Sequence, residues 1–392
     1  MPAGEVRGSV APGFDAVRDA FAVHLHDLGD GGAAFAAVIG GNVVVDLWAG
    51  CAGAREWSRE TRAVIMSATK GVAATAVACV VDDGLIDVEA PVASYWPEFA
   101  AAGKSEVTVA QLLSHSAGLV TVPGYEELLT PDGVGWGRTR EIVSRLAAAT
   151  PAWEPGTRHG YHGVTFGWLA GELVRRVTGT TIGRVVAERI AKPLDIELDL
   201  GTPSGIHDVV APTVLPRGPS PLLDMRSEMP DAELFDRMML TVDGRNVVDT
   251  ADRFFAAPGI LELELAAQNA TATARALAVM YGTLADEGRH GGDRVLLSPG
   301  TIGEVARERM QGPDALTGLE RHWGLGFQLA RPQLGPIWGA GEGSFGHDGF
   351  GGQIGFADPR ERLGVGFVRS HLAWTQSLGP ALTQAVYSCL RG

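Results

Sequence analysis

A serine and a lysine separated by two residues could supply a nucleophile and its activating base. The string Ser67-Ala68-Thr69-Lys70 begins an almost wholly apolar stretch that continues to Val81. Positions three apart share one face of a helix, so the Lys70 amine can reach the Ser67 hydroxyl. A serine hydroxyl is a weak nucleophile until a base removes its proton, and an amine in a dry site can be that base. The spacing predicts a serine hydrolase with Ser67 as nucleophile and Lys70 as its activator.

The scarcity of lysine strengthens this prediction. Of the 32 basic residues, only Lys70, Lys104 and Lys192 are lysines. Arginine keeps its proton, whereas a buried lysine can lose it, so a chain that prefers arginine should use lysine where proton transfer matters. The alternative is a helix cap followed by a solvated lysine. The apolar stretch argues against it, because a helix that is apolar on all sides is buried.

Patterns typical of strands lie near both ends of the chain, and helical patterns fill the middle. Strands are expected at 33–39, 43–48, 326–330, 352–357 and 364–369, and helices at 15–28, 67–81, 139–149, 165–178, 271–287 and 380–390. We predict an α/β (α+β) fold with a central antiparallel sheet flanked by helices and an inserted, mainly helical domain. The sheet domain should comprise 1–106 and 266–392. The helical domain should comprise 107–265, with a lid-like segment at 203–258.

Several motifs in one order resemble a known family. They are Ser67–Lys70, the stretches Leu85–Val92 and Leu112–Leu119, Glu154-Pro155-Gly156 followed by Tyr161, and Gly346–Gly352. Together they resemble the penicillin-recognising serine hydrolases, which include class C β-lactamases, DD-peptidases and family VIII carboxylesterases. The resemblance covers nearly the whole chain and implies a fold like that of a class C β-lactamase.

The resemblance also implies roles for residues outside the Ser-x-x-Lys motif. Tyr161 matches the family's catalytic tyrosine, which would approach its anionic form beside an ammonium and shuttle a proton. The backbone N–H groups of Ser67 and Phe350 would form the oxyanion hole. His347 stands where β-lactamases carry a lysine that helps to hold a substrate carboxylate, and Gly349 would let substrate pack against the strand edge.

Two departures from the β-lactamase pattern favour an esterase. Gly163 replaces the asparagine expected two places after Tyr161, so an amide-holding group is missing. His347 replaces a lysine and is mostly neutral at pH 7, so a carboxylate meets a weaker partner. We predict a carboxylesterase for short-chain esters that works through an acyl-enzyme on Ser67. The alternatives are a β-lactamase, a peptidase acting on D-amino acid substrates, and a non-catalytic penicillin-fold binding protein.

Other signals in the sequence are weaker. Ser114–Gly118 lacks the first glycine of a Gly-x-Ser-x-Gly elbow, and no helix is expected after the Gly341–Gly346 dinucleotide-like string. We expect His115, His159 and His162 to be loop or core residues. The metal-ligand and cofactor motifs considered do not occur, so no metal or cofactor is expected.

The overall composition limits the partners. The formal net charge is −14, which argues against nucleic acid. No signal peptide or membrane-spanning stretch is expected. The three dispersed cysteines fit a reduced, cytoplasmic setting. The partner should be a small-molecule ester.

Overall fold

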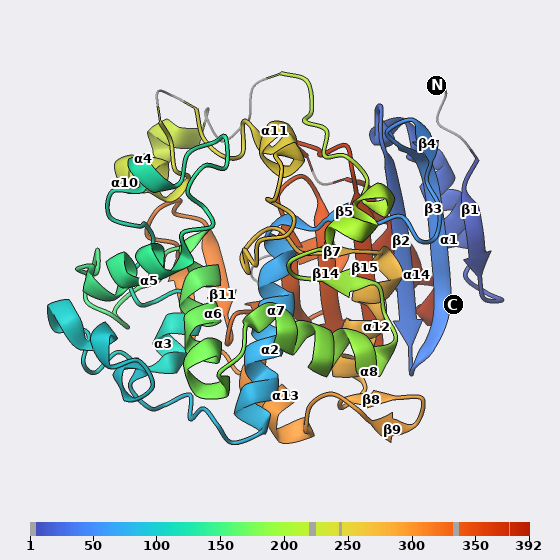
Figure 1. Ribbon diagram of the computed structural model, residues 1–392. Helices are drawn as coiled ribbons and strands as arrows, with labels where there is room; N and C mark the ends of the chain where they lie inside the picture. The colour runs from blue at the N-terminus through green and yellow to red at the C-terminus, as the bar shows by residue number, and fades with distance from the viewer. Residues whose placement is uncertain (1–4, 219–224, 243–244, 332–336, 376) are drawn as a thin grey trace.

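An antiparallel sheet built from both ends of the chain forms the centre of the molecule. The computed structural model describes residues 5–218, 225–242, 245–331, 337–375 and 377–392. The strands run in the order β1-β3-β2-β15-β14-β13-β12-β11-β10, each antiparallel to its neighbour, and β4 pairs with β3 (Figure 1). Their bounds are β1 Arg7–Val10, β2 Gly32–Ile39, β3 Asn42–Ala52, β4 Arg55–Glu56, β10 Met310–Pro313, β11 Glu320–Trp323, β12 Gln328–Leu329, β13 Phe345–Gly349, β14 Gln353–Asp358 and β15 Leu363–Arg369. The predicted antiparallel sheet from both termini is confirmed.

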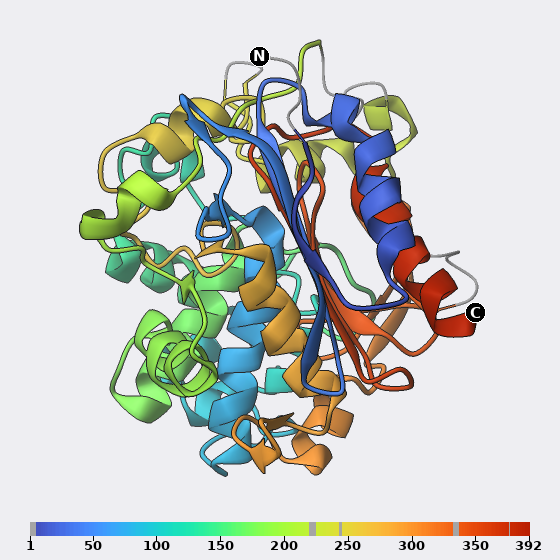
Figure 2. The same ribbon diagram turned by 90° about the vertical axis from the view of Figure 1, so that its right-hand side faces the viewer.

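Helices cover both faces of this sheet. Figure 2 shows α1 (Asp15–Val23) and α14 (Leu378–Arg391) on one face, and α2 (Thr69–Asp82) with α12 (Ala274–Ala285) on the other. Small residues of β15 face α12, because a Cβ added at Gly364 would lie 2.0 Å from the Gly282 nitrogen. The sheet and helix backbones therefore touch on this side.

Two expected helices differ from the prediction at their ends. The expected helix at 15–28 stops at Val23 and continues as a 3₁₀ turn, η1 (Leu25–Leu28). The helix expected from residue 271 starts at Ala274, because β7 (Thr271–Ala272) pairs with β5 (Ala63–Val64) and β6 (Leu198–Asp199). The two-stranded pair β8 (Arg289–His290) and β9 (Asp293–Arg294) and the helix α13 (Pro299–Val305) follow α12.

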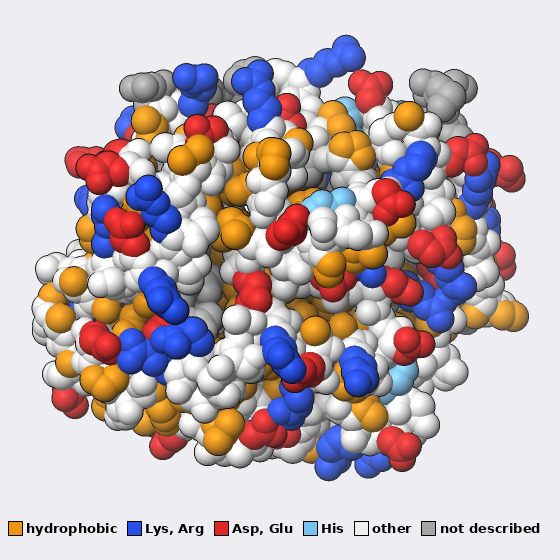
Figure 3. Space-filling view, in the orientation of Figure 1, with side chains coloured by type: hydrophobic (Ala, Val, Ile, Leu, Met, Phe, Trp, Pro, Cys, Tyr) orange, Lys and Arg blue, Asp and Glu red, His pale blue; other side chains and the backbone are white. Residues whose placement is uncertain are grey.

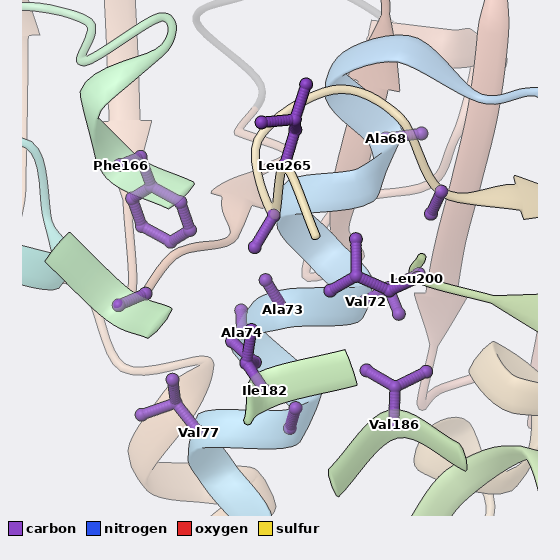
Figure 4. Packing of buried hydrophobic residues seen from close by; sticks show 14 of the residues in the cluster. Ala68, Val72, Ala73, Ala74, Val77, Phe166, Ile182, Val186, Leu200 and Leu265 are labelled. Atoms are coloured by element: carbon purple, nitrogen blue, oxygen red, sulfur yellow. The ribbon is translucent and has the colours of Figure 1, made fainter. Parts of the chain in front are cut away.

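Helix α2 runs through the middle of the molecule. Every residue from Thr69 to Val80 is buried. Figure 4 shows side chains of α2 among Phe166, Ile182, Val186, Leu200 and Leu265, which come from several other segments. The apolar character of the helix on all sides follows from this position.

The middle of the chain is mainly helical. Its elements include η3 (Val92–Ser94), η4 (Pro97–Gly103), α3 (Val109–Leu113), α4 (Tyr125–Leu128), α5 (Thr139–Ala148), α6 (Thr165–Thr178), α7 (Ile182–Val185), the π-helical η5 (Val186–Ala191), α8 (Lys192–Leu194) and η6 (Ser204–Val209). The segment predicted to be lid-like contains η7 (Arg226–Glu228), α10 (Ala232–Met238) and α11 (Ala251–Ala256), while its residues 219–224 and 243–244 lie outside the described residues. Because η4 packs against α5, contacts of the helical part begin before residue 107, and the domain boundary stays a prediction.

On the face that Figure 3 draws, neither sign of charge dominates. Figure 3 shows acidic and basic side chains interspersed over one face. Among the helices of the described ranges, none is long and apolar enough to cross a membrane.

Candidate active site

The Ser67 and Lys70 side chains meet at the start of α2. The Lys70 Nζ lies 3.2 Å from the Ser67 Oγ. It also donates to two backbone carbonyls, Gly163 O at 2.7 Å and Ala267 O at 3.0 Å. Two N–H groups of a neutral amine satisfy these carbonyls, which leaves the nitrogen lone pair for the Ser67 hydroxyl proton. The predicted pair therefore has a geometry suited to proton transfer from serine to lysine.

The surroundings of Lys70 favour this neutral amine. The side chain is completely buried. Burial holds the pKa of Lys70 well below its usual value, and the nearby Asp348 carboxylate opposes that shift. An amine with a lowered pKa can accept a proton near neutral pH.

A tight approach between β13 and the residues before α2 brings Ser67 to the edge of the sheet. Met66 adopts a left-handed backbone conformation, with φ of 50°, directly before Ser67. A Cβ added at Gly349 would lie 2.4 Å from the Ile65 carbonyl oxygen, so only glycine lets the strand come this close. Ser67 itself stays partly exposed in the short helix η2 (Met66–Ala68).

Tyr161 lies beside the Ser67–Lys70 pair. The Lys70 Nζ is 4.7 Å from the centre of the Tyr161 ring. That ring stacks on Trp323, with 5.9 Å between centroids and 12° between planes. Burial raises the pKa of Tyr161 above its usual range, and a side-chain hydrogen bond with Ser67 only partly offsets this effect. Burial therefore favours the neutral phenol, and the expectation that Tyr161 approaches its anionic form stays a prediction.

Two buried side chains hold the backbone around Tyr161. The Tyr161 N–H donates to Asp314 Oδ2 at 2.7 Å. The next N–H, of His162, donates to His115 Nδ1 at 3.1 Å. The Leu112–Leu119 motif thus supports the loop that carries Tyr161. Sequence analysis did not single out Asp314. Its only local signal is Gly318 four residues later, which is typical of a turn.

A third buried residue, Asn269, shapes the loop that supplies the Ala267 carbonyl. Its Nδ2 donates to Ile260 O at 2.8 Å and Leu263 O at 2.7 Å, and its Oδ1 accepts from Leu265 N at 3.0 Å. Sequence analysis did not single out Asn269, because nothing local in the chain shows that its neighbour contacts Lys70.

The residues of the Gly346–Gly352 motif divide between the cleft and the interior of the protein. Asp348, Gly349 and Phe350 line the cleft beside Ser67, whereas His347 is fully buried. The His347 Nδ1 lies 2.6 Å from the Asp348 carbonyl oxygen, and its ring centroid lies 6.1 Å from that of Tyr161. Burial and the proximity of Lys70 lower the pKa of His347 to about 4, so the ring is neutral at pH 7. His347 is buried beside Tyr161 and does not line the cleft, so its direct contact with substrate, expected from sequence, stays a prediction.

The cleft above Ser67 has a volume of about 410 Å³. Its lining includes apolar residues, among them Val164, Met225, Phe235, Met238, Met239 and Val247. Its lining also includes polar residues, among them Asp314, Thr317, Arg321, Gln328 and Asp348. A larger hollow of about 850 Å³ adjoins α5 and α6, but Ser67 and Tyr161 are not among its lining residues.

The weaker candidates lie away from this cleft. Ser116 is buried, and its hydroxyl donates to Gln111 O at 3.0 Å. His115, His159 and His162 are also buried and do not line the cleft. Among the described residues, no group of three or more His, Cys, Asp and Glu side chains could hold a metal ion.

Comparisons with known proteins identify the family of the chain. The sequence model of the family described as Beta-lactamase matches residues 17–384. An esterase/beta-lactamase of Mycobacterium tuberculosis, LipL, is 36% identical over 381 residues, which cover 93% of this chain and 82% of that protein.

Solved structures give the same picture. A family VIII carboxylesterase superposes with a TM-score of 0.86 and 37% identity, covering 98% of this chain and all of that one. A penicillin-binding protein homologue from Caulobacter crescentus superposes with a TM-score of 0.86 and 32% identity, again over 98% of this chain and all of that one.

Proposed function

The chain belongs to the beta-lactamase family, and from this membership and the geometry around Ser67 we propose that it is a serine carboxylesterase. The observation that carries the proposal is the Lys70 amine, which is buried, held by two carbonyls and 3.2 Å from the Ser67 hydroxyl. The names of the similar carboxylesterase and esterase/beta-lactamase support an ester as substrate.

In the proposed reaction, the Ser67 Oγ attacks the ester carbonyl carbon while its proton passes to the Lys70 Nζ. The backbone N–H groups of Ser67 and Phe350 stabilise the negative charge on the carbonyl oxygen. The bond to the alkoxy oxygen then breaks, and the proton held by Lys70 reaches the leaving alcohol through the Tyr161 hydroxyl. A raised pKa suits this relay, because the phenol keeps its own proton between transfers.

Deacylation repeats these steps with water as the nucleophile. Water attacks the acyl carbonyl carbon and gives up a proton to the Tyr161–Lys70 pair. The bond to the Ser67 Oγ breaks, and that oxygen recovers a proton. The products are a carboxylic acid, the alcohol and the unchanged protein.

The proposed preference for esters over β-lactams rests on two features of the site. Gly163 contributes a carbonyl to Lys70 but has no side-chain amide for a substrate. His347 is neutral and buried, so it offers no cation to a carboxylate in the cleft. The loss of one or two hydrogen-bond partners costs a few kcal/mol of transition-state stabilisation, on the order of 10²-fold in rate.

The test compares kcat/KM of one purified preparation for p-nitrophenyl acetate, p-nitrophenyl butyrate and a chromogenic cephalosporin. We expect the esters to exceed the cephalosporin by about 10²-fold or more. Equal or higher values for the cephalosporin would refute the esterase proposal in favour of a β-lactamase. A protein that turns over neither class and resists a fluorophosphonate label would instead be the non-catalytic binding protein.

A further inference from the structure

We propose that Met238 occupies the space that a side chain at position 163 would need, and that this part of the cleft is therefore an apolar subsite for the acyl group. The substrates are then esters of apolar carboxylic acids without an amide near the carbonyl. The acyl assignment rests on the proposed function. The packing between Met238 and Gly163 does not.

The first observation is the closeness of the two residues. A Cβ added at Gly163 would lie 2.4 Å from the Met238 Sδ. The backbone at Gly163 lies outside the left-handed region that favours glycine, so its conformation alone would accept other residues. The obstacle to a side chain at this position is therefore the Met238 thioether.

The second observation is that Met238 has little room to move away. It is 2% exposed and packs in a cluster with Val120, Trp153, Phe235 and Leu316. The segment that carries it is fixed to the helical part, because Thr121 Oγ1 donates to Arg237 O at 3.2 Å and Tyr125 OH donates to Thr241 O at 2.9 Å. An asparagine at position 163 would need the displacement of a packed side chain.

The third observation is the chemistry of the residues that line the cleft. Met66, Met225, Met238 and Met239, half of the eight methionines in the chain, line this cleft. Methionine is apolar, polarizable and able to adapt to differently shaped groups. Because Gly163 also binds Lys70 through its carbonyl, the Met238 side chain beside Gly163 lies close to the reacting atoms. An acyl chain attached to the Ser67 Oγ would extend along it.

The test of the acyl assignment compares Met238→Ala with the matched control Met229→Ala. Met229 belongs to the same cluster and is 8% exposed, but it does not line the cleft. We expect Met238→Ala to raise the ratio of kcat/KM for p-nitrophenyl octanoate to that for p-nitrophenyl acetate by about tenfold or more. Met229→Ala should leave the ratio unchanged. Equal ratios in the two variants would overturn the assignment.

A double-mutant cycle tests the packing without any activity measurement. Gly163→Asn should lower Tm strongly in the wild-type background and much less in the Met238→Ala background, because the smaller side chain makes room for asparagine. Equal losses in the two backgrounds would overturn the proposed obstruction. If the wild-type protein hydrolyses no ester, the proposed function and the acyl assignment both fail, while the cycle still decides whether Met238 blocks position 163.

Discussion

Replacing Lys70 by arginine tests most directly how the proposed nucleophile is activated. Arginine keeps the positive charge but does not lose its proton, so it cannot accept one from Ser67. Its planar guanidinium also does not fit a site shaped by two carbonyls and a hydroxyl, at 2.7, 3.0 and 3.2 Å from one nitrogen. We expect Lys70→Arg to be nearly as damaging as Lys70→Ala.

The size of the loss follows from the role of the base. General-base catalysis contributes about 10²–10⁴-fold, and loss of the geometry adds to this, so kcat should fall by about 10³-fold or more in both variants. A 10³-fold loss corresponds to about 4 kcal/mol of transition-state stabilisation. The assay is steady-state hydrolysis of p-nitrophenyl acetate, with Tm measured for each variant to separate misfolding from lost chemistry.

Lys104→Arg provides the matched control. Lys104 is also fully buried, and its Nζ donates to the carbonyl of Ala101 at 2.7 Å, but it does not line the cleft. This variant should lose stability and keep its activity per folded molecule. If Lys70→Arg keeps kcat within about tenfold of wild type while Lys70→Ala does not, Lys70 supplies only positive charge and the base assignment is wrong.

Three further predictions concern the same site and its surroundings. Ser67→Ala should abolish ester turnover and fluorophosphonate labelling with little change in Tm, whereas Ser116→Ala should keep both turnover and labelling. The reverse pattern would identify Ser116 as the nucleophile. Tyr161→Phe should keep the stacking on Trp323 but lower kcat by about 10²-fold or more, measured with p-nitrophenyl butyrate, and an unchanged kcat would exclude a proton relay through the phenol. Burial lowers the pKa of His162 and of His347 to about 4, below the usual value of 6.5, so the unfolded chain binds more protons in this range. The contribution of each neutral histidine to the unfolding free energy should therefore be fully present above about pH 6.5. It should be lost, by up to roughly 3 kcal/mol per histidine, as the pH drops to about 4. A Tm that is constant between these pH values would contradict the buried neutral state.

The sequence was most informative where the chemistry is local. Ser67 and Lys70 are three positions apart on one helix, so their proximity follows from helix geometry alone. Tyr161 was found through the resemblance to a family, because no local rule connects it with residues almost a hundred positions earlier. The antiparallel sheet followed from strand patterns at both ends of the chain.

Other parts of the site depend on tertiary contacts that leave no local pattern. Asp314 binds the backbone of Tyr161, which is distant in sequence, and Asn269 shapes a loop whose contact with Lys70 no local pattern shows. His347 was expected to face the substrate, but the orientation of a strand residue depends on how the strand packs, and in β13 it is Asp348 that lines the cleft. Met238 lies in the segment 203–258, whose weak pattern gave no expectation for any single residue.

The way in which Lys70 is held explains how a buried cationic side chain can become a base in this fold. A carboxylate partner would stabilise the ammonium and raise its pKa, whereas the carbonyls of Gly163 and Ala267 can be satisfied by the two N–H groups of the neutral amine. The Asp348 carboxylate raises the pKa of Lys70, and its Oδ1 accepts a hydrogen bond from Gln328 Nε2 at 2.9 Å. Both carbonyls belong to loops whose shape depends on other residues. The loop of Gly163 depends on the packing around Tyr161, and the loop of Ala267 depends on the hydrogen bonds of Asn269. The basicity of Lys70 is therefore a property of the backbone around it, and changes in those loops should alter catalysis even where no catalytic side chain is replaced.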